Sequence, residues 1–200
     1  MVKRILDLII GIIGFILTSP LWVYIIIRIK TEDRGPVFFV QERVGKDGKL
    51  FRMYKFRSMV VGAEQKGLGV FVRTDDERIT KIGKFIRKTS IDELPQLMNV
   101  LKGEMSIVGP RPTLEYQVKR YNERQKRRLL VKPGMTGWAQ INGRNTMTWP
   151  EKIELDLWYV DHWSIGLDLR IIGRTINSVI KKKGIYAEEG IIVDEISKID

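Results

Sequence analysis

The feature that most constrains this chain is an apolar run near its N-terminus. From Ile5 to Ile27 the sequence is almost entirely aliphatic or aromatic, and Asp7 is the only charged residue in it. A helix that enters a bilayer needs about 20 apolar residues, and this run is long enough. The run is too long for a secretory signal peptide, and no small-residue cleavage site follows it. We therefore predict a retained membrane helix, with its flanks, over residues 1–34.

Two details bear on how this helix sits in the membrane. Ser19 and Pro20 interrupt the run near its middle, and a proline removes a helical hydrogen bond and tends to kink a helix. Basic residues flank both ends, whereas the positive-inside rule expects them mainly on the cytoplasmic side. A helix that enters and leaves on the same face satisfies both observations, and Ser19 can then bond a carbonyl that the proline frees. A kinked helix that spans the bilayer stays open as the alternative.

Composition limits the chemistry of the remaining chain. Two hundred residues with 44% hydrophobic content suffice for one domain with a sizeable core. No cysteine is present and only one histidine, which excludes disulfides and leaves little room for zinc chemistry or a serine-type triad. Any bound metal is therefore expected to have oxygen ligands. The net charge of +11 indicates anionic partners, namely nucleic acid, acidic lipid or phosphorylated substrates.

The pattern after residue 34 predicts an α/β fold that is mainly helical, with one small β-hairpin. Its strands are expected at 36–43 and 50–56, joined by a turn at 45–48. The apolar stripe of the last predicted helix fits either a membrane surface or a protein core. We place a catalytic domain at 35–184 and a tail at 185–200. Helices are expected over 79–88, 91–101, 113–130, 148–163 and 167–183, with loops at 62–76 and 131–145.

An acidic pair, Asp92 and Glu93, opens one of these predicted helices. Ser90 and Glu93 have the spacing of a capping box, and Asp92 is an alternative N-cap because Pro95 cannot donate a hydrogen bond. The same geometry also favours chemistry. A helix N-terminus lowers the pKa of Asp92 and attracts a phosphate, and an ionised carboxylate beside a bound phosphate can act as a nucleophile.

Phosphoryl transfer also requires cations that neutralise the developing charge, and the sequence places several nearby. Arg87 directly precedes the acidic segment. Arg111 lies between two prolines, which present its guanidinium from a rigid turn suited to bidentate phosphate contact. Three further basic residues are candidates for substrate contact: Lys55, Arg57 and Arg144.

Several segments, in this order, closely resemble the bacterial sugar transferase family, the monotopic phosphoglycosyl transferases. The likeness runs from the membrane segment to about residue 183, and four co-linear motifs make it specific. The segments are YKFRSM at 54–59, SIDELPQ at 90–96, GPRP at 109–112 and PGMTGWAQ at 133–140, with NGR at 142–144.

The resemblance implies a two-step transfer of a sugar phosphate to a lipid. Asp92 attacks the β-phosphate of a UDP-sugar and expels UMP, which leaves a covalent phosphosugar on the enzyme. Polyprenyl phosphate, expected to be undecaprenyl phosphate, then takes the phosphosugar from Asp92 and initiates glycoconjugate assembly. Glu93 is the catalytic partner, Arg87 and Arg111 contact phosphate, and a magnesium ion is expected at Asp92.

The resemblance also implies a re-entrant helix broken at Ser19 and Pro20, packed against a catalytic domain on the cytoplasmic surface of the bacterial inner membrane. Its partners are then the UDP-sugar, the polyprenyl phosphate and membrane lipids, with no nucleic acid. Two rival functions are a basic module that binds acidic lipid or nucleic acid, and a scaffold for a glycan-assembly complex. Neither gives Asp92 and Glu93 a role between arginines. The sequence indicates no particular sugar or oligomeric state.

Overall fold

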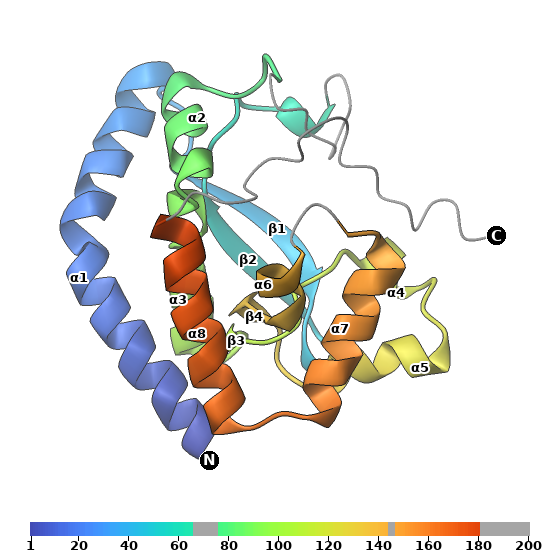
Figure 1. Cartoon of the computed structure of the whole chain (residues 1–200). Coiled ribbons are helices and arrows are strands. Elements are labelled where there is room, and N and C mark those ends of the chain that lie inside the picture. The colour runs from blue at the N-terminus through green and yellow to red at the C-terminus, as the bar shows by residue number, and fades with distance from the viewer. Residues whose placement is uncertain (66–75, 144–146, 181–200) are drawn as a thin grey trace.

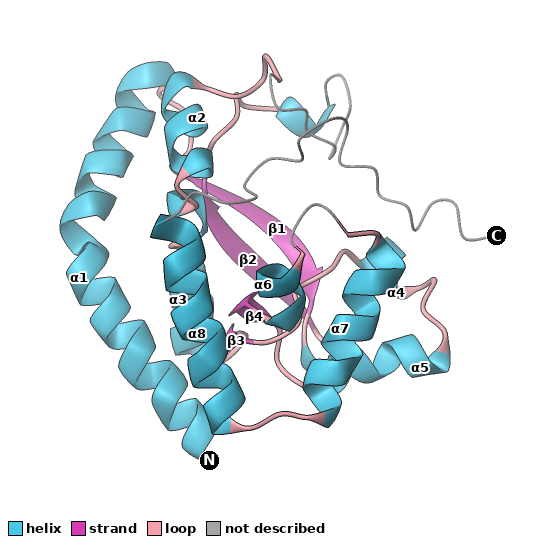
Figure 2. Cartoon of the chain, in the orientation of Figure 1, coloured by secondary structure: helices cyan, strands magenta, loops and turns pink. Residues whose placement is uncertain are grey.

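The computed structural model describes residues 1–65, 76–143 and 147–180. It shows a mainly helical chain with two small two-stranded sheets, which confirms the predicted fold class in outline (Figure 1, Figure 2). The predicted tail, residues 185–200, lies outside the described part. The α-helices are α1 (Val2–Asp33), α2 (Lys81–Lys88), α3 (Gln96–Lys102), α4 (Glu115–Val118), α5 (Glu123–Lys126), α6 (Trp138–Asn142), α7 (Trp149–Asp161) and α8 (Ile165–Ile180). The strands are β1 (Phe38–Val44), β2 (Leu50–Phe56), β3 (Ser106–Val108) and β4 (Gly134–Thr136), and the 3₁₀ turns are η1 (Lys46–Gly48), η2 (Ala63–Gln65), η3 (Ile91–Glu93) and η4 (Arg127–Leu130).

Helix α1 is one curved, continuous helix, although Pro20 lies inside it (Figure 1). Proline has no N–H to bond the carbonyl four residues earlier, that of Ile16. The Ser19 hydroxyl donates to this carbonyl at 2.8 Å, which confirms the predicted role of Ser19. The helix continues through Ser19 and Pro20 without the break that the resemblance implied, and the Ser19 side chain satisfies the freed carbonyl.

One face of α1 packs on the protein and the other is bare. The most apolar 18-residue window has a mean hydropathy of 2.2 and is only 17% buried, so α1 is long and apolar enough to cross a membrane and is unlike the core helix of a soluble protein. Ile16 and Leu17, near its middle, are 62% and 74% exposed. The packed face belongs to a cluster of buried side chains from α1, β2 and α2: Trp22, Ile25, Ile29, Phe56, Ile82 and Ile86.

Both ends of α1 are fastened to the rest of the chain by charged side chains. At the N-terminal end, Lys3 Nζ pairs with Asp168 of α8 at 2.5 Å. The buried Asp7 carboxylate accepts hydrogen bonds from β3 at 2.8 and 2.9 Å, which satisfies the one charge in the apolar run. At the C-terminal end, Arg57 Nη1 donates to Asp33 at 2.6 Å. The helix is therefore attached at both of its ends to the rest of the chain.

The hairpin of β1 and β2 forms as predicted. Val44 stands opposite Leu50, and β2 has the predicted bounds, while β1 runs from residue 38 to 44. The turn places Asp47 and Gly48 at φ of 55° and 77°, a left-handed conformation that an Asp-Gly pair adopts at low cost. This register sets which hairpin side chains share a face with Lys55.

The segment 91–101, predicted as one helix, is instead the turn η3 followed by α3. Pro95, which has no N–H, lies at the N-cap of α3 and separates the two. Gly103 ends α3 at φ 86°, as predicted. Helix α2 begins at residue 81, two positions after the predicted start. Of the predicted loop at 62–76, residues 66–75 lie outside the described part.

The segment 113–130, predicted as one basic helix, consists of α4, α5 and η4. The Asn122 side chain accepts from the Gln125 N–H at 2.9 Å and so starts a new helix within the segment. The predicted loop at 131–145 contains β4, which pairs in parallel with β3, and helix α6. These short elements depend on partners far away in the chain, which sequence periodicity does not reveal.

Helix α7 begins at the predicted capping box, since the Glu151 carboxylate accepts from the Thr148 N–H at 2.7 Å. It ends at residue 161, two positions early. In α8 the predicted apolar stripe is only partly core, because Leu169 and Ile176 are 55% and 56% exposed while Ile172 packs against the core. Ile171, on another face, is buried. The apolar stripe of α8 is therefore partly packed and partly exposed over its described side chains.

Candidate active site

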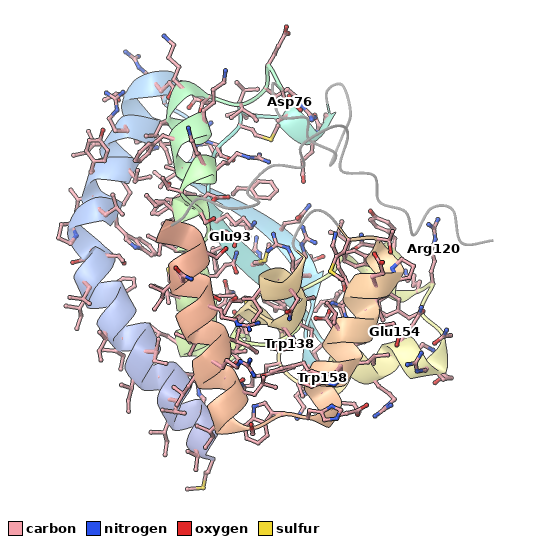
Figure 3. All side chains as sticks on the ribbon, viewed as in Figure 1. Asp76, Glu93, Arg120, Trp138, Glu154 and Trp158 are labelled. Carbon is pink, nitrogen blue, oxygen red and sulfur yellow. The ribbon has the colours of Figure 1, made fainter. Side chains whose placement is uncertain are left out.

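The two carboxylates stand on η3, in the short link between α2 and α3. Ser90 has φ 56° and turns the chain out of α2. Residues three apart lie on the same side of a 3₁₀ turn, and here Ile91 and Leu94 both pack into the core. Asp92 and Glu93 lie between these two apolar contacts. Figure 3 shows Glu93 beside the β-hairpin, in the interior of the fold.

Glu93 is held by two cations from distant parts of the chain. Its Oε1 atom accepts from Lys55 Nζ at 2.7 Å and from Arg111 Nη2 at 3.0 Å. Burial alone would raise the pKa of the Glu93 carboxyl, but the charges and hydrogen bonds of Lys55 and Arg111 outweigh it and hold this pKa well below its usual range. Ser90 makes no capping hydrogen bond, so the capping-box interpretation of Ser90 and Glu93 is wrong.

Asp92 has a different environment from its neighbour. It is half-buried, and it forms no side-chain hydrogen bond or ion pair with any residue that the structure describes. Burial raises the pKa of Asp92 to about 6, with Glu93 acting in the same direction and Lys55 against it. The predicted lowering of this pKa is therefore wrong, because desolvation outweighs the positive charges nearby. The N-cap role of Asp92 is wrong as well, because Asp92 lies inside η3 and the N-cap of α3 is Pro95. At neutral pH Asp92 is still mostly ionised.

The other predicted cations have different positions. Arg87, half-buried in the last turn of α2, lowers the pKa of Asp92 by its charge and makes no side-chain bond within the described part of the chain. Arg57 is buried and paired with Asp33, so the structure assigns its guanidinium to the end of α1. Arg144 lies outside the described residues. Lys55, Arg87 and Arg111 are thus the predicted cations that act on the carboxylates.

The turn that carries Arg111 is fixed from several sides, as the flanking prolines predict. Its backbone makes two hydrogen bonds with β4, of 2.8 and 2.9 Å. A Cβ atom on Gly109 would lie 2.4 Å from the carbonyl of Lys132, so only glycine allows this approach. The guanidinium of Arg111 is half-exposed, which leaves part of it open to a ligand while it holds Glu93.

Sequence reasoning missed Arg43, a further cation of this site. Burial and the charge of Arg111 lower the pKa of Arg43 to about 10, and Arg43 interacts electrostatically with Glu93. In the hairpin register Arg43 faces Phe51 and Lys55 faces Phe39, so both basic residues lie on the same side of the sheet. The alternation of side chains along each strand could have placed Arg43 on the same side of the hairpin as Lys55 from the sequence.

Asn99 was also missed, and it joins the helix after the carboxylates to the strand that carries Lys55. Its side chain is fully buried. The amide accepts from the Tyr54 N–H at 3.1 Å and donates to the Arg52 carbonyl at 2.7 Å. These bonds fix α3 against β2 and so set the position of Lys55 relative to Glu93.

The donor set fits a magnesium ion only in part. No group of three or more Asp, Glu, His or Cys side chains gathers within the described ranges. Asp92 nevertheless offers an unengaged carboxylate, and magnesium commonly binds one or two carboxylates together with substrate phosphates and water. These residues therefore suit a magnesium ion whose other ligands come from a phosphorylated substrate.

Comparison with known proteins identifies the family of this chain. Residues 1–182 match the family described as bacterial sugar transferase. The chain is 50% identical over 183 residues to the uncharacterized sugar transferase EpsL of Bacillus subtilis, covering 92% of this chain and 89% of that one. It is 45% identical over 192 residues to the UDP-glucose:undecaprenyl-phosphate glucose-1-phosphate transferase of Klebsiella pneumoniae, and 42% over 198 residues to the undecaprenyl-phosphate galactose phosphotransferase of Salmonella typhimurium. In both of these pairs the aligned region covers 92% of this chain but only 41% of the relative. The chain therefore belongs to the bacterial sugar transferase family.

Proposed function

We propose that this enzyme transfers a sugar 1-phosphate from a UDP-sugar to undecaprenyl phosphate, through a covalent intermediate on Asp92. The names of the Klebsiella and Salmonella relatives support the acceptor and the reaction class. The observation that carries the proposal is the state of Asp92, a carboxylate without a side-chain partner among the described residues, surrounded by the charges of Lys55, Arg87 and Arg111. A pure anion binder has no use for a free carboxylate at this point.

In the first step the cations hold the diphosphate of the donor. Arg87 and the exposed part of Arg111 can donate hydrogen bonds to the phosphates. Their positive charge also allows the carboxylate and the diphosphate, both anions, to approach each other. An Asp92 oxygen attacks the β-phosphorus and forms a new P–O bond. The bond from this phosphorus to the bridging oxygen breaks, and its electron pair leaves with UMP. The product is an acyl phosphate on Asp92 that carries the sugar.

In the second step an oxygen of the lipid phosphate attacks the same phosphorus, and the bond to Asp92 breaks. The carboxylate is restored and the lipid diphosphate sugar leaves. A phosphate monoester has a second pKa of about 6, so the acceptor is mostly dianionic and needs no strong base. Glu93, whose pKa is held low, is a poor base. We therefore assign Glu93 the role of orienting Lys55 and Arg111.

Asp92 would also hold a magnesium ion, together with the phosphates of the bound donor. The ion would supply charge neutralisation at the diphosphate. This role matches the oxygen-only ligands that the sequence provides and the unengaged state of Asp92.

The attachment of α1 supports a re-entrant position on the cytoplasmic face of the inner membrane. Lys3 at one end and Asp33 at the other both pair with the same body. A spanning helix would place its ends about 30 Å apart on opposite sides of the hydrocarbon. A catalytic domain on one membrane surface then cannot contact both ends of the helix. A shallow helix with its bare middle in the lipid satisfies all these contacts.

The test is UMP release and adduct formation by the purified chain in lipid nanodiscs. A panel of UDP-sugars, incubated without acceptor, should give one UMP per enzyme and an intact mass increased by one phosphosugar. Adding undecaprenyl phosphate should remove the adduct and start turnover. Asp92→Asn should form no adduct, whereas Glu42→Gln, at an exposed carboxylate of the hairpin, should behave as the wild type. Undiminished turnover by Asp92→Asn would overturn the mechanism, and no UMP from any donor would favour a scaffold.

A further inference from the structure

A buried ion pair lies behind the turn that carries Arg111. Arg128 of η4 and Asp156 of α7 are 3% and 2% exposed, and Arg128 Nη2 donates to Asp156 Oδ2 at 2.5 Å. Of the ion pairs between described residues this is the most buried. The guanidinium also donates to the Tyr121 hydroxyl at 2.5 Å and lies 5.6 Å from the rings of Tyr121 and Trp149. The plane of Arg128 is therefore fixed on several sides.

The same guanidinium reaches the active site through the backbone. Arg128 Nη2 donates to the carbonyl oxygen of Arg111 at 3.1 Å. The side chain of that residue is the one that bonds Glu93 at 3.0 Å. One hydrogen bond therefore separates a rigid, buried cation from a residue of the proposed catalytic centre.

Stability alone does not account for this pair. Replacing a buried ion pair by apolar side chains of similar volume is often neutral or stabilising, because both charges must be desolvated. Burial indeed raises the pKa of Asp156 even though Arg128 opposes the shift. What an apolar pair would lack is a donor for the Arg111 carbonyl. The extra contact, rather than the ion pair itself, is the feature that needs a reason.

We propose that Arg128 is a positioning residue, which Asp156 anchors and which holds the backbone of Arg111 so that its guanidinium meets Glu93 and the substrate phosphate. The expected effect on turnover rests on the proposed function, whereas the expected effect on the position of Arg111 does not. Misplacing a phosphate-binding group by about 1 Å costs on the order of a hundredfold in rate. Arg128 itself touches no substrate in this scheme.

Three changes test the proposal. Arg128→Lys keeps the charge but loses the fork that serves several acceptors at once. The double change Arg128→Met with Asp156→Leu removes both charges and keeps the volume, so that folding is preserved. Arg124→Lys is the matched control, because Arg124 also pairs with α7, through Glu154, and has no bond to Arg111.

We expect the first two variants to lose turnover on the order of a hundredfold, while the double variant melts close to the wild type and Arg124→Lys keeps full turnover. In an Arg111→Ala background, Arg128→Lys should cause no further loss. Full turnover in the folded double variant would overturn the proposal. So would a loss in the combined Arg111→Ala and Arg128→Lys variant that equals the product of the two single losses.

A second readout is independent of sugar transfer. Carbon-13 NMR of labelled carboxyls in the full chain should show the pKa of Glu93 rising in the double variant, because Arg111 no longer holds its position. An unchanged Glu93 pKa would contradict the positioning role. A raised Glu93 pKa in a protein that releases no UMP would support the positioning role while the proposed function failed.

Discussion

Lys55 on β2 and Glu93 on η3 form an ion pair of 2.7 Å, which joins the hairpin to the segment that carries both carboxylates. The charge of Lys55 also lowers the pKa of Asp92, against the effect of burial. Lys55 therefore sets the ionisation of both acidic residues while it directly contacts one of them. The ion pair is the link between hairpin register and the reactivity proposed for Asp92.

Removing this charge should move the pH dependence of the enzyme. In Lys55→Met the pKa of Asp92 should rise above about 6, because the cation that favours the ionised form is lost. Since the nucleophile must be ionised, the acid limb of the profile of kcat/KM against pH should shift to higher pH. Lys49→Met, at an exposed lysine of the same hairpin, is the control. An acid limb that stays in place would argue against Lys55 acting on Asp92.

Asp92→Asn should stabilise the fold at neutral pH. Burial raises the pKa of Asp92 from 3.8 to about 6, so the folded chain binds this proton more tightly than the unfolded chain does. Ionisation of Asp92 therefore destabilises the fold as pH rises through about 6. Asparagine avoids this cost and should raise the melting temperature by about 2–4 °C per kcal/mol recovered. The gain should disappear below pH 3.8, where both states of the wild type are protonated. Equal melting temperatures at neutral pH would refute this account.

Arg87 and Lys88 offer a matched pair of neighbouring cations. Arg87 is half-buried near Asp92 and forms no side-chain bond with the described residues, whereas Lys88 is exposed. Arg87→Gln should therefore leave the melting temperature almost unchanged and weaken binding of the UDP-sugar by about tenfold or more, the loss of one charged hydrogen bond. Lys88→Gln should change binding little. Both changes are made in the Asp92→Asn protein, so that UDP-sugar binding can be titrated without turnover. Equal effects of the two changes on binding would count against a phosphate role for Arg87.

Arg57 was expected at the substrate, and its contact with Asp33 predicts another phenotype. Loss of the pair should loosen the end of α1 and lower stability by about 1.5–3 kcal/mol. Arg57→Gln and Asp33→Asn should therefore have the same effect on unfolding, and neither should change KM for the donor more than about twofold, because neither charge acts on the carboxylates. Denaturant unfolding and donor kinetics of both variants provide the check. A large rise in KM confined to Arg57→Gln would restore the substrate role.

The sequence was sufficient for features that depend on neighbouring residues. The hairpin follows from alternation and an Asp-Gly turn, and the start of α7 follows from Thr148 and Glu151, three positions apart. The same spacing at Ser90 and Glu93 was misleading, because Glu93 pairs with the cationic side chains of two distant segments and not with the backbone of Ser90. The role of Asp92 as the nucleophile stays a prediction, and the direction of its pKa shift depends on burial, which needs the tertiary structure.

Features that depend on distant partners were not accessible. Strand β4 is only three residues long and exists through its pairing with β3, so no periodicity marks it. Arg128 looks like one of several basic residues in a charged segment, and its burial against Asp156 appears only when α7 packs on η4. The break at Pro20 was expected because proline usually disrupts a helix, but α1 continues through Pro20, and Ser19 bonds the freed carbonyl.

The position of α1 in the membrane can be decided with single cysteines, since the chain has none of its own. Val2→Cys and Lys30→Cys place a thiol near each end of α1, at exposed positions. If the helix re-enters, a maleimide that does not cross membranes should label both thiols in inverted vesicles and neither in intact cells. A third variant, Leu17→Cys, at the bare middle, should resist the reagent in both preparations until detergent is added. Labelling of Val2→Cys and Lys30→Cys from opposite faces would instead establish a spanning helix. The contacts of Lys3 and Asp33 with one catalytic domain would then have to break in the membrane, so the same result would also remove the structural support for a re-entrant position.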